Sequence, residues 1–200
     1  MQATWGFLNP GCADVRLMTM LDREQLLKAL EELEKELAQQ EVRAELFVVG
    51  GEVLVIAYNS RRATTDIDAI FVPTKEVRIA AERVAEKLNI KDDWLNDGVK
   101  GFIPGEDPDR SSVYEGPNLS VSAASPKFLL AMKLMASRAD RDHDDIKFLY
   151  KLCEFTTPEE GLDLLEKYYP ARVIMPRVQF MLQEMFPKER SKDDDRGYSR

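Results

Sequence analysis

The chain has 200 residues, of which 44% are hydrophobic, and its formal net charge is −8 at pH 7. A chain of this size can bury one good core with a helical addition, and its acidity disfavours broad electrostatic binding to nucleic acid, although a local basic groove stays possible. Its two cysteines lie far apart without metal-ligand spacing, which disfavours a disulfide framework and a zinc site and fits a reducing compartment.

The ends of the chain give no sign of targeting to a membrane. No apolar run approaches the roughly 18 residues of a membrane span, and the N-terminus lacks the basic and long apolar regions of a signal peptide. We therefore expect a cytoplasmic protein without a membrane partner. Residues 1–19 have no clear period and are predicted to be a loosely ordered leader, whereas residues 188–200 are charged and are predicted to be a disordered tail.

The first regular element is predicted to be a helix from Arg23 to about Gln40. Asp22 is a suitable N-cap, and Gln25 three residues later can return the hydrogen bond of a capping box. Leucines at helical spacing supply an apolar stripe, at Leu26, Leu30, Leu33 and Leu37. One face of this helix should therefore pack on the core.

The most informative stretch joins an apolar run to the pair Gly50 and Gly51 and then to Asp66 and Asp68. The run, residues 45–49, is short and rich in β-branched side chains, which predicts a buried strand, and the glycines let the backbone approach a phosphate. On a strand the two aspartates share a face, with Cα atoms roughly 6.5–7 Å apart. Both carboxylates can then reach one or two divalent cations. This pattern predicts a metal and phosphate site.

The wording of this stretch carries a family resemblance. Gly50-Gly51 followed by Arg62-Ala63-Thr64-Thr65-Asp66-Ile67-Asp68 resembles the signature of the minimal nucleotidyltransferases of the DNA polymerase β-like superfamily. It looks most like the branch with the abortive-infection type IV toxin nucleotidyltransferases and their uncharacterised relatives. The resemblance implies that Asp66 and Asp68 are catalytic and hold Mg²⁺ or Mn²⁺. It also implies nucleotide binding by a second set of residues, which are Gly50, Gly51, Arg62, Thr64 and Thr65.

The Asp pair opens a second apolar run, residues 67–73, which is predicted to be a strand. The segments before and after this stretch are predicted to be helical. Residues 52–59 contain β-branched and aromatic side chains that favour a strand. The resemblance instead implies a short helix there, whose N-terminus would aim N–H groups at a phosphate, and we follow it. Residues 74–89 have apolar side chains on one side of a predicted helix that should pack on the sheet.

The segment of residues 91–117 is rich in Asp, Gly and Pro and is predicted to be a loop. Within it, Trp94 belongs either to an ordered loop beside the active site or to a plug at the edge of the core. Residues 119–123 alternate apolar residues with serine, which predicts a strand. Many members of the wider superfamily carry a third carboxylate on this strand. Ser120 and Ser122 occupy those positions here, a departure that argues against a three-carboxylate centre.

A second block of sequence matches the same resemblance. The helix predicted after Ser125 carries Lys133 alone in an apolar run, where a lysine either snorkels to solvent or is directed into a site. Arg141, Asp142 and Asp145 follow, and Asp142 shares the apolar stripe of the next helix, so it needs a partner. The toxin-like enzymes also have a lysine-bearing helix and then an R-D-x-x-D stretch. This implies that Lys133 is catalytic and that the other three orient a cation or act as acceptor base.

These elements predict an α/β (α+β) fold with a small mixed sheet flanked by helices. The nucleotidyltransferase-like core should cover residues 20–124 and a helical C-terminal part should cover residues 125–187. Capping signals predict two further helices in that part, after Thr157 and from about Pro176 to Phe186. We expect the Lys133 block to converge on the cleft of the Asp pair.

The predicted function is metal-dependent transfer of a nucleotide from a nucleoside triphosphate to an unidentified acceptor, which is tRNA or other RNA, a protein or a small molecule. The resemblance extends this to the toxin of a toxin–antitoxin pair, with an antitoxin as partner. One alternative keeps the fold as a catalytically inactive nucleotide-binding or partner-binding module. Another is a glycosyltransferase that uses the Asp pair for a sugar-nucleotide metal, but that class does not require the glycine pair.

Overall fold

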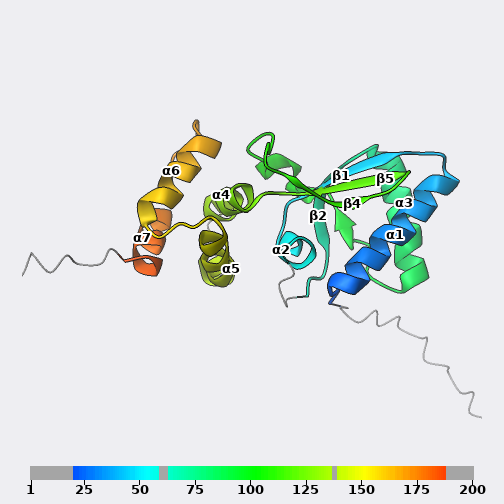
Figure 1. The fold of residues 1–200 in the computed structure, drawn as a ribbon, viewed down its shortest axis with the longest axis horizontal. Helices are drawn as coiled ribbons and strands as arrows, with labels where there is room; N and C mark the ends of the chain where they lie inside the picture. Colours follow the sequence, from blue (N-terminus) through cyan, green and yellow to red (C-terminus); the bar gives the residue numbers. More distant parts are fainter. Residues whose placement is uncertain (1–19, 59–62, 137–138, 188–200) are drawn as a thin grey trace, which may run out of the picture.

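The computed structural model describes residues 20–58, 63–136 and 139–187, and Figure 1 shows their arrangement. The elements in chain order are α1 Arg23–Gln39, β1 Ala44–Val48, α2 Glu52–Ile56, β2 Ile67–Val72, α3 Thr74–Leu88, β3 Leu95–Asn96, the 3-10 helix η1 Gly98–Phe102, β4 Ser111–Glu115, β5 Leu119–Ala123, α4 Pro126–Ala136, α5 Ala139–Leu152, α6 Pro158–Tyr168 and α7 Pro176–Met185. The predicted α/β fold, with a mixed sheet flanked by helices, is confirmed. The predicted leader and tail lie outside the described residues.

One five-stranded sheet forms the centre of the described part, in the order β3-β2-β1-β5-β4. The central strand β1 is antiparallel to β2 and parallel to β5, β4 is antiparallel to β5, and β3 is parallel to β2. The loop prediction for residues 91–117 is wrong, because this segment contains β3, η1 and β4. The two residues of β3 are too few to show a period, and β4 is an edge strand without a fully buried residue, so neither left a hydrophobic alternation to detect.

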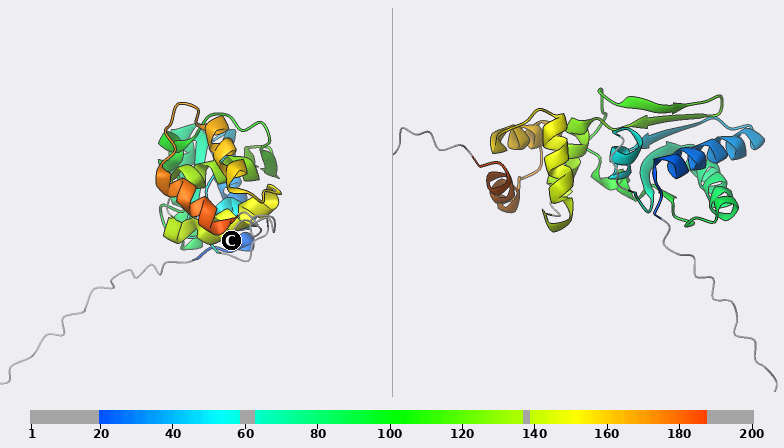
Figure 2. Two further views of the ribbon diagram at one scale, coloured as in Figure 1. Left: turned by 90° about the vertical axis from the view of Figure 1, so that its left-hand side faces the viewer. Right: turned by 60° about the horizontal axis from the view of Figure 1, so that its bottom comes forward.

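Helices α1 and α3 lie side by side against one face of the sheet (Figures 1 and 2). Helix α1 begins as predicted, because the side chain of Asp22 accepts from the N–H of Gln25 and the Gln25 side chain accepts from the N–H of Asp22, both at 2.9 Å. Alternate strand residues and the helix stripes meet in the core between these layers, with Leu46, Val48, Ile67, Ala69, Phe71, Val121, Leu30 and Val84 among its fully buried members. Burial of these side chains supplies most of the driving force for folding.

The opposite face of the sheet carries the residues that alternate with this core. Phe47 on β1 is the register partner of Ile70 on β2 and of Ser122 on β5, so these three side chains share that face. Asp68, two residues before Ile70, lies on it as well. The Phe128 ring of α4 packs edge-on against Phe47, with ring centroids 5.6 Å apart. Helix α4 therefore attaches the C-terminal helices to the face that bears Asp68.

The C-terminal helices extend away from the sheet, with α6 and α7 at the end of the molecule opposite α1 and α3 (Figure 1). Aromatic contacts connect them to each other. Phe128 meets Tyr168 of α6 edge-on at 5.7 Å, and Tyr150 of α5 stacks on Phe186 at 3.8 Å. Helix α6 opens with the predicted capping box between Thr157 and Glu160. No helix in the described ranges is both long enough and apolar enough to cross a membrane.

Candidate functional site

The glycine pair forms the turn between β1 and the short helix α2. The helix implied by the resemblance is present, and the strand indicated by propensity for residues 52–59 is wrong for the described part of that segment. All five residues of α2 are buried. Burial on every side rewards close packing in whichever conformation the surroundings allow, so tertiary context overrides the weak intrinsic preference of Val and Ile for strands.

Asp66 and Asp68 stand at the start of β2, directly beside this turn. Asp66 immediately precedes the strand and Asp68 is its second residue. Both are half-buried, whereas Ile67 between them and Ala69 after them are fully buried in the core. The alternation therefore directs both carboxylates to the sheet face away from α1 and α3.

The carboxylate of Asp66 is held from both sides. Its Oδ1 accepts a hydrogen bond from the hydroxyl of Thr65 at 2.9 Å, and its Oδ2 accepts from Nδ2 of Asn96 at 3.2 Å. Asn96 is itself oriented, because its Oδ1 accepts from the N–H of Gly98 at 3.2 Å. The hydroxyl of Thr64 donates to the backbone carbonyl of Asp66 at 3.1 Å. The two threonines predicted to bind nucleotide thus have their hydroxyls on Asp66.

Asn96 is a site residue that sequence reasoning did not single out. It lies on β3, beside Asp68 in register. Its neighbour Trp94 is fully buried and donates its indole N–H to the carbonyl of Ala81 at 3.0 Å. Of the two interpretations of Trp94, the plug in the core is confirmed, and it places the polar residue two positions later against Asp66. A location beside the active site stays a prediction. An apolar anchor followed closely by an amide was the available signal.

Glu52 is a second residue that the sequence reasoning missed. Its side chain is only 3% exposed, and its Oε1 accepts hydrogen bonds from the N–H of Gly50 and from the N–H of Asp68, each at 2.8 Å. Burial and, secondarily, the charge of Asp68 raise the pKa of Glu52 to about 8. Its sequence signal was a carboxylate that opens a continuous apolar run straight after a glycine pair.

Gly50 and Gly51 differ in what surrounds them. A Cβ atom on Gly50 would collide with the carboxylate of Glu52, whereas a Cβ on Gly51 would meet nothing within 4 Å. The N–H of Gly50 is donated to Glu52. Gly50 is therefore small because an internal carboxylate lies against it, and the open space that a ligand could enter is beside Gly51.

Strand β5 has no carboxylate on the face that bears Asp68. Ser122 is the register partner of Phe47, and its hydroxyl lies 3.4 Å from the carbonyl oxygen of Leu46, to which it donates. The Ser120 hydroxyl donates to the exposed Glu115 at 2.9 Å. Among the described residues, no group of three or more His, Cys, Asp or Glu side chains is placed to hold a metal ion. Among the described residues, the carboxylates on this face at the start of β2 are those of Asp66 and Asp68.

Lys133 lies in an acidic cluster between α4 and α5. Its ammonium is 2.9 Å from Oδ1 of Asp142 and 3.0 Å from Oδ2 of Asp145, and all three side chains are less than a fifth exposed. The snorkelling interpretation is therefore wrong, and Asp142 has the partner that its place on the apolar stripe required. Arg62 and the side chain of Arg141 lie outside the described residues. Convergence of this cluster on Asp66 and Asp68 stays a prediction.

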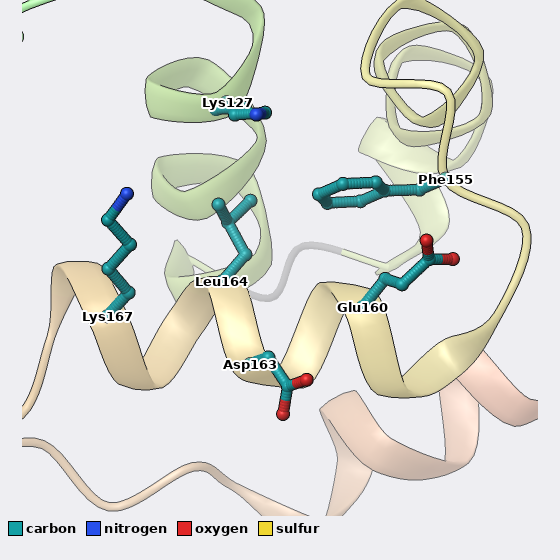
Figure 3. Close-up of a pocket in the computed structure, with 6 residues that line it drawn as sticks. All are labelled: Lys127, Phe155, Glu160, Asp163, Leu164 and Lys167. Carbon is teal, nitrogen blue, oxygen red and sulfur yellow. The ribbon is translucent and has the colours of Figure 1, made fainter.

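A shallow hollow of about 300 Å³ lies elsewhere, between α4 and α6. Figure 3 shows its lining, which is Lys127, Phe155, Glu160, Asp163, Leu164 and Lys167. Glu160 is already occupied as the acceptor of the N-terminal capping box of α6. The lining combines exposed charges of both signs with two apolar side chains and contains none of the predicted site residues. We do not assign the chemistry to it.

A mixed sheet with a glycine turn after β1 and paired aspartates at the start of the adjacent strand defines a nucleotidyltransferase-type core. The chain belongs to the family described as "Nucleotidyltransferase of unknown function (DUF6036)", whose model matches residues 24–157. Comparison with curated proteins and with solved structures gave no match. The family match includes the glycine turn, the Asp pair and the Lys133 cluster, and it ends before α6. It supports nucleotidyl transfer in general, with a nucleotide as substrate.

Proposed function

We propose that the protein is a metal-dependent nucleotidyltransferase of the DNA polymerase β-like type. The observation that carries the proposal is the pairing of Asp66 and Asp68 on one sheet face beside the open side of Gly51, in a chain of a nucleotidyltransferase family. The reaction is an in-line displacement at the α-phosphorus of a nucleoside triphosphate. An acceptor oxygen forms a bond to the α-phosphorus while its proton passes to a base, and the bond from the α-phosphorus to the departing pyrophosphate breaks.

The residues fit Mg²⁺ or Mn²⁺ at the Asp pair. These ions prefer oxygen ligands, and Mg²⁺ is often held by one or two carboxylates with substrate phosphates and water. The hydrogen bonds from Thr65 and Asn96 orient the Asp66 carboxylate while each oxygen keeps a further lone pair. Asp66 and Asp68 would hold the ion, which when bound offsets the charge that develops on the phosphate oxygens.

The other residues of the chain position the nucleotide and balance its charge. The backbone at Gly51 has room for a phosphate, because no atom lies where its side chain would be. Lys133 supplies a cation whose direction is fixed by Asp142 and Asp145, and Arg62 would supply another. Oriented cations stabilise the transition state more than mobile ones, because they need no reorganisation when the charge shifts.

The acceptor and the biological setting rest on the resemblance. The order of the glycine pair, the Asp pair, Lys133 and the R-D-x-x-D stretch supports a toxin-like enzyme that acts on RNA, a protein or a small molecule and is held in check by an antitoxin. The two-carboxylate site favours one other candidate, an inactive nucleotide-binding module. Growth arrest on expression, relieved in an Asp68→Asn variant, is expected for the toxin.

Transfer of label from nucleoside triphosphates tests the activity. The purified protein is incubated with Mg²⁺ or Mn²⁺, each of four α-labelled triphosphates, and whole-cell RNA, protein or small-molecule extracts. We expect label on one acceptor class, and a loss of orders of magnitude in Asp66→Asn and Asp68→Asn, since a neutral amide holds a hard cation poorly. Asp163→Asn on exposed α6 is the matched control and should be fully active. Label that is unaffected by the Asp66 and Asp68 variants contradicts the proposal.

A further inference from the structure

The Glu52 side chain connects the glycine turn to the start of β2, where Asp68 lies 16 residues further along the chain. A single oxygen, Oε1, accepts from the N–H of Gly50 and from the N–H of Asp68 at 2.8 Å each. The other four residues of α2 are Val53, Leu54, Val55 and Ile56, and all are buried. Core packing alone would be served by another apolar residue, and burial of a carboxyl group without hydrogen bonds is costly. The place of this side chain therefore calls for a role.

The Glu52 side chain accepts a hydrogen bond that a backbone carbonyl would accept in a regular β-ladder. Val48 is the register partner of Ala69, so Val49 lies opposite Asp68, and the N–H of Val49 donates to the carbonyl of Asp68 at 3.0 Å. In a continued antiparallel ladder, the N–H of Asp68 would donate to the carbonyl of Val49 in return. It donates to Glu52 instead. The main chain at Asp68 is thus held on the donor side by a side chain and on the acceptor side by the strand.

Gly50 makes this arrangement of hydrogen bonds possible. A β-carbon at this position would collide with the Glu52 carboxylate, so the glycine lets the carboxylate reach the N–H of Gly50 and the N–H of Asp68 together. Fixing the backbone of a residue at both its N–H and its C=O restricts the direction of its side chain. The turn and the Asp68 carboxylate are consequently held in one geometry.

We propose that Glu52 is a positioning residue that fixes the Asp68 carboxylate relative to the glycine turn, and so sets the distance between the bound metal and the triphosphate. The proposal rests on the proposed function for its catalytic meaning. Glu52 itself does not bind the metal in this proposal, and it affects the reaction only by positioning Asp68. Partners that orient metal ligands are typically worth about 10–100-fold in metal affinity or activity.

Variants of Glu52 separate positioning from mere stability. Glu52→Gln keeps an acceptor oxygen of the same reach, whereas Glu52→Asp is shorter by one methylene and Glu52→Ala removes the acceptor. We expect the Ala and Asp variants to raise the Mg²⁺ concentration for half-maximal transfer by about tenfold or more and to lower kcat, and the Gln variant to stay close to wild type. Glu36→Ala removes another buried glutamate, which on α1 pairs with Arg83 of α3, and should lower stability without changing the Mg²⁺ requirement.

A readout that does not depend on activity is the hydrogen exchange of the Asp68 amide, measured by NMR. It should be protected in wild type and in Glu52→Gln and exchange much faster in Glu52→Asp, which serves if the Ala variant does not fold. A folded Ala or Asp variant with a wild-type Mg²⁺ requirement overturns the proposal, as does an Asp68 amide that is unprotected in wild type. If wild type shows no metal binding and no transfer, the proposed function fails and the exchange rates alone decide whether Glu52 holds Asp68.

Discussion

Lys133 is expected to contribute both to the proposed transfer reaction and to the stability of the folded protein. The ammonium sits between two carboxylates that are mostly shielded from water. Replacing it, in Lys133→Met, removes the cation that Asp142 and Asp145 share. We expect a loss of about 2 kcal/mol in the free energy of unfolding, below the 3–5 kcal/mol typical of fully buried pairs because these groups keep some exposure. Urea denaturation followed by circular dichroism measures it.

A triple variant makes the Lys133 prediction sharper. Lys133→Met combined with Asp142→Asn and Asp145→Asn removes all three charges and should recover most of the lost stability. Transfer activity should not recover if Lys133 neutralises phosphate charge. A stable triple variant with full activity would show that the cluster is purely structural.

The alkylation rate of Cys153 gives a pH-dependent test of the burial of its thiol. Burial raises the pKa of its thiol to about 11, from an ordinary value of 9.0. Only the thiolate is alkylated, so the rate of modification by iodoacetamide should still rise about tenfold per pH unit between pH 9 and pH 10. For a short cysteine-containing peptide, whose thiol has an ordinary pKa, the alkylation rate should level off in this pH range. Mass spectrometry of the peptide that contains Cys153 gives the rate, and a plateau near pH 9 contradicts the prediction.

At the scale of elements, two substitutions in the glycine turn should have different effects, one on stability and the other on triphosphate binding. Gly50→Ala should destabilise the protein and weaken transfer, because its Cβ would displace the buried Glu52 carboxylate from its hydrogen bonds with the N–H groups of Gly50 and Asp68. Gly51→Ala meets open space, and its helical backbone angles suit alanine, so it should fold as well as wild type or slightly better. Its defect should appear only as a higher KM for the triphosphate. Thermal unfolding and transfer kinetics of the two variants check this, and a stable Gly50→Ala protein would contradict it.

The sequence predicted the elements that have long periodic patterns and strong caps. Helix α1 after the Asp22 cap, β2 from Ile67 and α4 directly after Ser125 all begin at the predicted residues. Strands β3 and β4 were missed because one is too short for a period and the other is exposed. Their positions depend on pairing with strands already present, which single-sequence patterns do not contain.

The candidate site was predictable only where a motif named it. Asp66 and Asp68 come from spacing and resemblance, but Asn96 and Glu52 reach them through contacts across 30 and 16 residues of chain. A local pattern can single out such residues, but it does not determine how a buried tryptophan and a five-residue helix dock, and the contacts depend on that. The resemblance implies that Thr64 and Thr65 bind the nucleotide, whereas in the structure their hydroxyls donate to Asp66. A hydroxyl next to an aspartate in the sequence gives no sign of which of the two it contacts.

At the scale of the whole molecule, α6 and α7 lie outside the family match but complete the hydrophobic packing. Tyr150 is buried against Phe186 and lies so close to Gly161 that a β-carbon there would collide with its hydroxyl. Ending the chain at residue 157 should uncover Tyr150 and Phe128 and cost roughly 2 kcal/mol for each large side chain exposed. We expect the truncated protein to aggregate or to unfold at a clearly lower temperature, by differential scanning calorimetry, and equal stability would contradict this packing account.

The central claim is that the Asp pair binds a divalent cation together with a nucleoside triphosphate. Isothermal titration calorimetry tests it most directly, with each triphosphate titrated into wild type and into Asp68→Asn, in Mg²⁺ and again in EDTA. We predict that wild type binds at least one triphosphate far more tightly with Mg²⁺ than in EDTA, and that Asp68→Asn loses this difference while remaining folded. Wild type that binds no triphosphate at millimolar concentration, or an Asp68→Asn variant that keeps the full effect of Mg²⁺, would contradict it.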